Sequence, residues 1–242
     1  MTLWPLALKA LIFSLLFLRV SAQGGFFWTF VFLAVTIYFY FQPLFEAKKF
    51  IYSFGIMIIY ALIVAGFLSN NNFGDLAAWA LAIVFGIAFF MLLGVKNFSF
   101  LRRDINFNVL ASAFYFLISA VFFIADKTAS ADFIFYFIVS CAAFYGILKE
   151  FIDFSYFEFP KTKKNLIVAG SAFLIMELIS VVALLPIGFL NSSALMLLFI
   201  FISEDFIAHH LKGNLNRQMI LNNVTILIVA MIFIFATSKW TP

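Results

Sequence analysis

The chain has 242 residues, of which 66% are hydrophobic and only 11% charged, with a formal net charge of +4. A soluble domain has about 25% charged residues, so this composition excludes a water-soluble globular surface, and it offers no basic hydrophilic face for nucleic acid. The single cysteine, Cys141, excludes an internal disulfide and a thiolate metal cluster. We therefore expect an all-α, polytopic integral membrane protein of the cell (inner) membrane, without a cofactor.

Nine stretches of the chain are apolar enough to cross a bilayer, since a membrane helix needs about 20 mostly apolar residues. The segments between them are too short for a soluble domain, so we expect one transmembrane domain over residues 1–242. The predicted spans, in chain order, are residues 3–22, 26–45, 50–69, 76–95, 106–125, 132–150, 165–189, 194–211 and 218–238.

The first span ends like a cleavable signal peptide. Val20, Ser21 and Ala22 follow an apolar run, as small residues do at a secretory cleavage site. Arg19 interrupts that run just before the site, which favours a retained first helix. Removal of residues 1–22 would leave eight spans, with both termini outside.

Lysine and arginine gather in alternate loops. The odd-numbered loops hold only Arg19 and Lys127, whereas the even-numbered loops hold eleven basic residues. Because such an excess marks the cytoplasmic side, we predict a cytoplasmic N-terminus and, after nine crossings, a C-terminus outside. The eleven residues are Lys48, Lys49, Lys96, Arg102, Arg103, Lys149, Lys161, Lys163, Lys164, Lys212 and Arg217.

Small residues recur every four positions in two spans. They are Ala78, Ala82 and Gly86 in the fourth span, and Ala142 and Gly146 in the sixth. This spacing allows helices to approach closely. It predicts helix packing within the bundle, or self-association or contact with a partner membrane subunit.

A segment rich in acids and aromatic rings follows the sixth span. Residues 151–164 read "FIDFSYFEFPKTKK". We expect them to extend the sixth span along the cytoplasmic interface, with rings among the lipid headgroups. Lys161, Lys163 and Lys164 would then contact anionic headgroups, and a surface for a partner protein is the alternative.

Glu177 is the deepest ionisable residue of the seventh span. It lies 13 residues after Lys164, or about 20 Å along a helix. An acid near the bilayer centre needs a partner, water or its neutral form, and Ser180, one turn on, can share its proton. Either Glu177 relays protons or cations, or it binds a neighbouring helix. Pro186, near the end of this span, predicts a kink or the helix end.

The eighth span ends in "ISEDFIAHHLKG", which holds two adjacent acids and both histidines of the chain. Asp205 and His209 are four residues apart, so they share a helix face and can touch. Glu204 points about 100° away from Asp205, and His210 leaves on another side. Zinc usually takes three or four protein ligands, so Asp205 and His209 support a metal site only weakly.

Other polar residues lie at a comparable predicted depth. Asn222, Asn223 and Lys9 can join Glu204, Asp205 and His209 in one polar layer in the cytoplasmic half of the bundle. Because histidine changes charge near neutral pH, the layer suits a gate, a proton carrier or a general base. The alternative for the two histidines, which we favour, is a helix end that reaches water and complements the helix dipole. Capping does not need two adjacent acids, so Glu204 and Asp205 favour function.

Three functions remain open, in order of preference. The first is ion- or proton-linked transport, with Glu177 as the titrating group and the Asp205–His209 layer as its cytoplasmic mouth. The second is a non-catalytic assembly subunit whose polar layer joins helices. The third is a membrane-embedded enzyme that acts on a lipid at the cytoplasmic leaflet with Asp205–His209 as base. The chain contains no nucleophile elbow or phosphate-binding loop, so enzymatic function is the least favoured.

Overall fold

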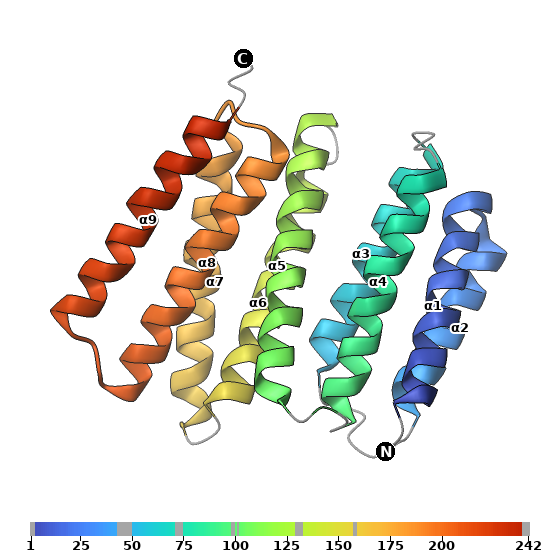
Figure 1. The fold of residues 1–242 in the computed structure, drawn as a ribbon, viewed down its shortest axis with the longest axis horizontal. Coiled ribbons are helices and arrows are strands. Elements are labelled where there is room, and N and C mark those ends of the chain that lie inside the picture. Colours follow the sequence, from blue (N-terminus) through green and yellow to red (C-terminus); the bar gives the residue numbers. More distant parts are fainter. Residues whose placement is uncertain are drawn as a thin grey trace. The chain divides into compact units, whose positions relative to one another are not determined.

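The computed structural model describes residues 3–42, 50–70, 75–97, 100, 102–128, 133–156 and 159–238. Within these ranges the regular secondary structure consists of nine helices and no strands (Figure 1). Eight of the nine are long and apolar enough to cross a membrane, whereas the sequence predicts nine spans. The helices are α1 (Trp4–Gln23), α2 (Phe26–Phe41), α3 (Ile51–Asn70), α4 (Asp75–Lys96), α5 (Arg103–Thr128), α6 (Phe133–Ser155), α7 (Lys161–Ala183), α8 (Phe189–Lys212) and α9 (Arg217–Thr237).

The remaining helix, α2, is apolar but shorter than the predicted span. It has 16 residues, about 24 Å at the usual rise, and ends at Phe41 rather than at residue 45. The reason is the Gln42–Pro43 pair, because a residue before proline is pushed out of the helical region. Gln42 has φ −103° and ψ 115°. Residues 43–45 lie outside the described part of the chain.

The helix ends near Pro186 and in segment 151–164 also differ from the predicted spans. Helix α7 ends at Ala183, three residues before Pro186, so the proline terminates the helix, which was one of the two predicted outcomes. Helix α6 continues to Ser155 and α7 begins at Lys161. Most of segment 151–164 therefore belongs to the ends of these two helices, and its position at the interface stays a prediction.

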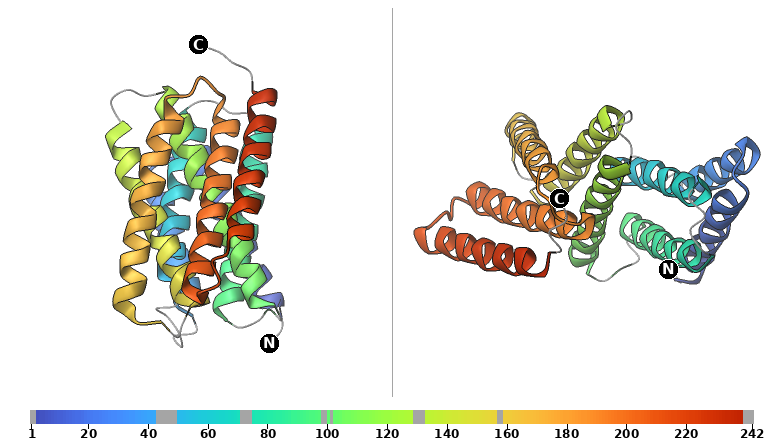
Figure 2. Two further views of the ribbon diagram at one scale, coloured as in Figure 1. Left: turned by 90° about the vertical axis from the view of Figure 1, so that its left-hand side faces the viewer. Right: turned by 90° about the horizontal axis from the view of Figure 1, so that it is seen from above.

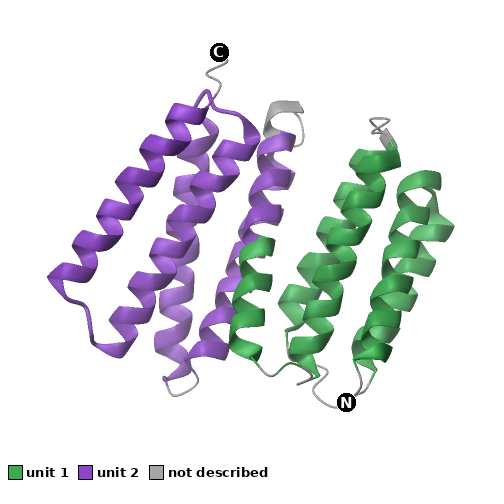
Figure 3. Cartoon of the chain, in the orientation of Figure 1, with its two compact units in different colours: residues 1–114 green, residues 115–242 purple. Residues whose placement is uncertain are grey.

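Residue contacts divide the chain into two compact units, residues 1–114 and residues 115–242 (Figure 3). The boundary falls inside α5. That residues 1–242 form a single transmembrane domain stays a prediction.

In unit 1, α1 packs against α2, α3 and α4 (Figure 2). Aromatic rings fill its core: Phe13 contacts Phe32 and stacks on Phe89, with ring centroids 5.1 and 4.6 Å apart. At the α1–α4 contact, the Ser14 hydroxyl donates to the Ala82 carbonyl (2.9 Å), and a Cβ added at Gly86 would overlap that hydroxyl. Ala82 and Gly86 are thus used for packing inside this unit.

Two lysine side chains donate hydrogen bonds to carbonyls at the C-terminal end of α2. The Lys9 ammonium donates to the carbonyls of Phe39 (3.4 Å) and Gln42 (3.0 Å). Lys96, the last residue of α4, is buried; it donates to the Tyr40 carbonyl and lies 4.2 Å from the centre of the Tyr40 ring. The last carbonyls of a helix lack partners within the helix, so these ammonium groups stabilise its negative end.

In unit 2, α6 packs on α7, α7 on α8, and α8 on α9. Helix α9 is the most exposed, and Asn223 is its one buried residue. Two side-chain hydrogen bonds join it to α8. Asn223 Nδ2 donates to Asp205 Oδ2 (2.7 Å), and Asn191 Nδ2 donates to the hydroxyl of Ser238 (2.8 Å), just after α9. In Figure 2 these two helices run side by side.

Candidate acid–base site in unit 2

The end of α8 fixes where its histidines lie. Gly213 follows the helix with φ +69°, a left-handed conformation that favours glycine. The amide of Gly213 donates to the His210 carbonyl (3.2 Å) and that of Asn214 to the His209 carbonyl (3.0 Å). This pair of bonds is the Schellman ending, and it satisfies the carbonyls of the two histidines.

Asp205 is held from two helices. One carboxylate oxygen, Oδ2, accepts from Asn223 of α9 at 2.7 Å. The other, Oδ1, lies 3.3 Å from Nδ1 of His209, one turn on in α8. The Asp205 and His209 side chains are 43% and 36% exposed, so the pair is oriented by the protein and still accessible.

The contacts of His209 assign its neutral tautomer. Nδ1 lies 2.9 Å from the Asp205 carbonyl oxygen and 3.3 Å from its carboxylate. Both neighbours are acceptors, so Nδ1 must carry the hydrogen, and Nε2 is left with a free lone pair. An imidazole oriented in this way by a carboxylate can accept a proton at Nε2.

Glu204 faces α5, whereas Asp205 faces α9. Its carboxylate accepts a hydrogen bond of 2.7 Å from the hydroxyl of Tyr115 in α5. The Tyr115 side chain is completely buried and stacks near Phe144 of α6, with centroids 6.1 Å apart. The two adjacent acids of α8 therefore turn to different helices, as their helical spacing predicts.

Tyr156 lies close to both acids, just after the end of α6. Burial raises the pKa of its phenol, and the nearby charges of Glu204 and Asp205 raise it further. The phenol therefore stays protonated at neutral pH and is available as a hydrogen-bond donor. We call Tyr115, Tyr156, Glu204, Asp205, His209 and Asn223 the acid–base cluster.

The other predicted site residues lie elsewhere. Glu177 is exposed on the face of α7 that also exposes Phe173, Leu174 and Val181. The Ser180 hydroxyl donates to the carbonyl of Met176 (3.0 Å). Asn222 and His210 are exposed, and Lys9 belongs to unit 1.

The three lysines predicted to bind anionic lipid differ in their surroundings. Lys161 and Lys163 are exposed at the start of α7. Lys164 is buried, and its ammonium pairs with Asp153 of α6 at 2.9 Å. Lipid binding stays a prediction, and Lys161 and Lys163 are the residues free to make it.

Metal ligation has little support in this geometry. Among the residues with described placement, no three His, Cys, Asp or Glu side chains gather closely enough to hold a metal ion. Asp205 and His209 therefore remain two ligands at most, fewer than the three protein ligands usual for catalytic zinc.

Sequence reasoning missed Tyr115 as a site residue and expected the Tyr156 ring among lipid headgroups. Tyr156 is 9% exposed and its ring contacts Phe159, with centroids 6.4 Å apart, and its position among the headgroups stays a prediction. One signal was present: Tyr115 lies near the middle of its predicted span, and a buried tyrosine needs a partner for its hydroxyl.

The chain matches no protein-family model, no curated protein and no solved structure at the level that indicates relationship. The class of protein therefore rests on the fold and on the position of the site. In the part of the chain that the structure describes, eight helices are long and apolar enough to cross a bilayer. They indicate an integral membrane protein, with an acid–base cluster toward one end of unit 2.

Proposed function

We propose that the protein is a membrane-embedded hydrolase that acts on a lipid from the cytoplasmic leaflet, with His209 as general base. The observation that supports this proposal is the Asn223–Asp205–His209 arrangement, which orients an accessible imidazole. A base must lie within reach of the proton that it abstracts. Half-exposed side chains near a helix end meet that requirement for a substrate at the membrane interface.

The reaction follows from the contacts. Nε2 of His209 takes a proton from water as the water oxygen bonds to the electrophilic carbon or phosphorus of an ester linkage in the interfacial part of the lipid. The bond from that atom to the leaving oxygen then breaks, and the proton passes from His209 to the leaving oxygen. Asp205, held by Asn223, stabilises the imidazolium that forms in between. The phenol of Tyr156, which stays protonated, donates to the negative charge that develops on the substrate.

The position of the cluster favours this function over transport. A reaction at one leaflet needs access from one side, whereas transport needs a path through the bilayer. Glu204 lies eight residues before Lys212, the end of α8, about 12 Å at helical rise. Glu177, the acid expected to continue a path, faces outward from unit 2 instead.

The test is turnover of lipid by the purified protein in mixed-lipid nanodiscs, followed by mass spectrometry. We expect products whose combined mass is that of a substrate lipid plus one water. His209→Ala should lower the rate at least 10²-fold, the usual contribution of a general base, whereas His210→Ala should leave it near the parent value. No product from the parent protein, or equal loss in both variants, would contradict the proposal.

Proton-linked transport is a second candidate, and one observation favours it. The part-buried Tyr115–Glu204 pair lies beside the more accessible Asp205–His209 pair, so Glu204 and His209 offer a proton two acceptors that differ in exposure. In proteoliposomes with an imposed pH difference, transport predicts a flux that Glu204→Gln abolishes. The hydrolase predicts lipid turnover without such a flux.

An assembly subunit, the second preference from the sequence, is the third candidate. It predicts that every intramembrane acid has a protein partner, which Glu204 and Asp205 have. Exposed Glu177 would then mark the face of α7 that another subunit covers. This function predicts no lipid turnover and no proton flux. It also predicts that another subunit co-purifies with the protein and that Glu177→Leu abolishes this co-purification.

A further inference from the structure

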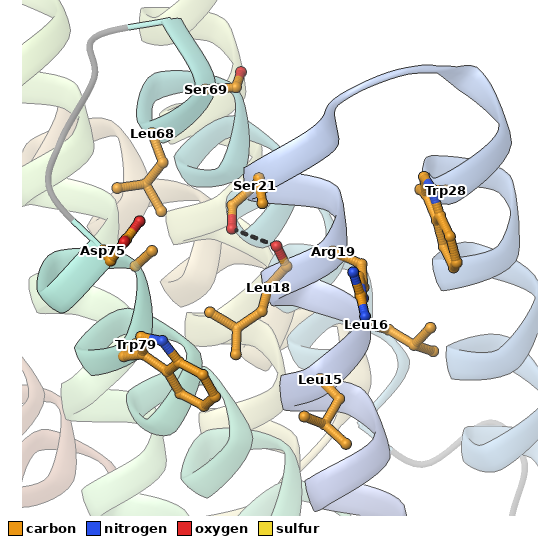
Figure 4. A pocket seen from close by; sticks show the side chains of 12 residues that line it. Leu15, Leu16, Leu18, Arg19, Ser21, Trp28, Leu68, Ser69, Asp75 and Trp79 are labelled. Carbon is orange, nitrogen blue, oxygen red and sulfur yellow. Dashed lines mark hydrogen bonds between the residues drawn. The ribbon is translucent and has the colours of Figure 1, made fainter.

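A polar hollow lies in unit 1, at the helix ends that the loop charges assign to the outside (Figure 4). It has a volume of about 700 Å³ and lies between the ends of α1 and α3 and the starts of α2 and α4. The residues that line it all belong to unit 1, whereas the acid–base cluster belongs to unit 2. The hollow is therefore a separate site, which the proposed hydrolysis does not use.

The two charged side chains of the hollow, Asp75 and Arg19, face different sides of α1. In Figure 4, Asp75 and Trp79 of α4 lie on one side of α1, and Arg19 lies on the other, toward Trp28 of α2. Asp75 is exposed and forms no ion pair with any residue that the structure describes. The α4 side of the hollow therefore offers a negative charge to a ligand.

An apolar groove continues from the α4 side of this hollow along the α1–α4 contact, with a volume of about 530 Å³. The residues that line both are Leu15, Leu18 and Trp79. Arg19 and Trp28 lie outside the lining of the groove, so the groove is on the same side of α1 as Asp75. Ala7, at its far end, lies eleven residues before Leu18, so the groove is about 16 Å long.

The sequence of α4 explains how the acid and the groove come together. Asp75, Trp79 and Ile83 follow at intervals of four residues, so they lie on one face of the helix. The carboxylate stands at the outer end of that face, the indole ring comes next, and apolar side chains follow. Small residues beneath them leave the space of the groove: Ala10, Ser14, Ala82 and Gly86. An indole face attracts cations, so this arrangement is complementary to a positive group that carries an apolar chain.

We propose that unit 1 binds a cationic amphiphile, a long-chain amine or quaternary ammonium compound, from the outer leaflet. The positive head contacts the Asp75 carboxylate and the Trp79 ring, and the alkyl chain lies in the apolar groove. A zwitterionic phospholipid is a poorer ligand, because the phosphate beside its ammonium group is repelled by Asp75 and cannot reach Arg19 on the other side of α1. An uncharged amphiphile fills the groove without meeting the charge of Asp75.

The test uses the fluorescence of Trp79 as a local probe, in a parent protein that carries Trp4→Phe, Trp28→Phe and Trp240→Phe. In dodecyl maltoside micelles it is titrated with an alkyltrimethylammonium and with an alkylphosphocholine. Both carry the same brominated chain, which quenches nearby indole. The trimethylammonium compound should quench at a several-fold lower mole fraction, and Asp75→Asn should bring the two compounds to about the same mole fraction.

A competition experiment separates the groove from the charge. The same alkyltrimethylammonium without bromine should relieve the quenching in the parent protein. Tetramethylammonium, which has the charge but no chain, should not relieve it at the same concentration. Equal relief by both compounds would show that the apolar groove takes no part in binding, and this would overturn the proposal.

The matched control is Asp104→Asn, which removes an exposed acid from the first turn of α5 in the same unit. It should leave the preference for the cation unchanged. Equal quenching by the two brominated compounds in the parent protein overturns the proposal, and so does a preference that survives in Asp75→Asn. Because the parent comparison decides by itself, a variant that fails to fold does not rescue the proposal.

Discussion

Asn222 and Asn223 are neighbours in the sequence with opposite surroundings. Asn222 is exposed, whereas Asn223 is buried and donates to Asp205 at 2.7 Å. Asn223→Ala leaves a carboxylate without its donor, so we expect a loss of about 1–3 kcal/mol of unfolding free energy. Asn222→Ala should change it by less than about 0.5 kcal/mol. Denaturant unfolding in detergent measures both, and equal losses would contradict this account of Asp205.

The raised pKa of Tyr156 predicts that the stability of the folded protein falls at alkaline pH. Its pKa is raised in the folded protein, by burial first and then by Glu204 and Asp205. At neutral pH both folded and unfolded states keep the proton, so the shift has no effect there. Above the ordinary tyrosine pKa of about 10, the unfolded state loses the proton first, and stability falls as pH rises toward the folded value.

The measurement is the thermal midpoint in detergent between pH 8 and pH 11. Tyr156→Phe should reduce the alkaline loss of stability that the parent protein shows. Tyr38→Phe removes a tyrosine that is 60% exposed in unit 1 and should not alter it. A Tyr156→Phe protein with the parent's pH profile would rule out this role for the phenol.

At the scale of elements, the packing of α1 against α4 depends on the absence of a side chain at Gly86. A methyl group there overlaps the Ser14 hydroxyl, which bonds the Ala82 carbonyl. We expect Gly86→Ala to cost about 1–3 kcal/mol, as overpacking does. Adding Ser14→Ala to that variant removes the overlapping oxygen and should restore part of the loss, which a double-mutant cycle measures.

Gly66→Ala is the control for this prediction. Gly66 lies inside α3 with no atom within 4 Å of an added Cβ, so alanine should stabilise the helix by up to about 1 kcal/mol. Equal effects at Gly66 and Gly86 would show that backbone entropy, and not the contact with α1, decides the result.

Local patterns predict the elements well because membrane helices depend on length and apolarity, both of which are visible in the sequence. They also predict that Asp205 and His209 meet and that Glu204 turns away, since those relations lie within one helix. Partners on other helices are different. That Tyr115 meets Glu204, or that Glu177 faces outward, depends on how each helix is rotated against its neighbours, which helical spacing alone does not determine.

At the scale of the whole molecule, the loop charges predict which helix ends face the cytoplasm. Cys141 is the single cysteine, so Cys141→Ser provides a background for labelling. Gln23→Cys, at an outer end, should react in intact cells with a membrane-impermeant thiol reagent. Asn214→Cys, between α8 and α9, should react only after permeabilisation, and the reverse pattern would invert the topology.

Helix α9 is joined to α8 by a hydrogen bond near each end and is exposed along most of its length. Asp205 and Asn191 are 14 residues apart on α8, and Ser238, just after α9, is 15 residues from Asn223, so the two bonds are about 21–23 Å apart along either helix. Sliding α9 by one turn would break both bonds at once. The position of α9 along α8 is therefore coupled to the orientation of the Asp205 carboxylate. A change in one must disturb the other.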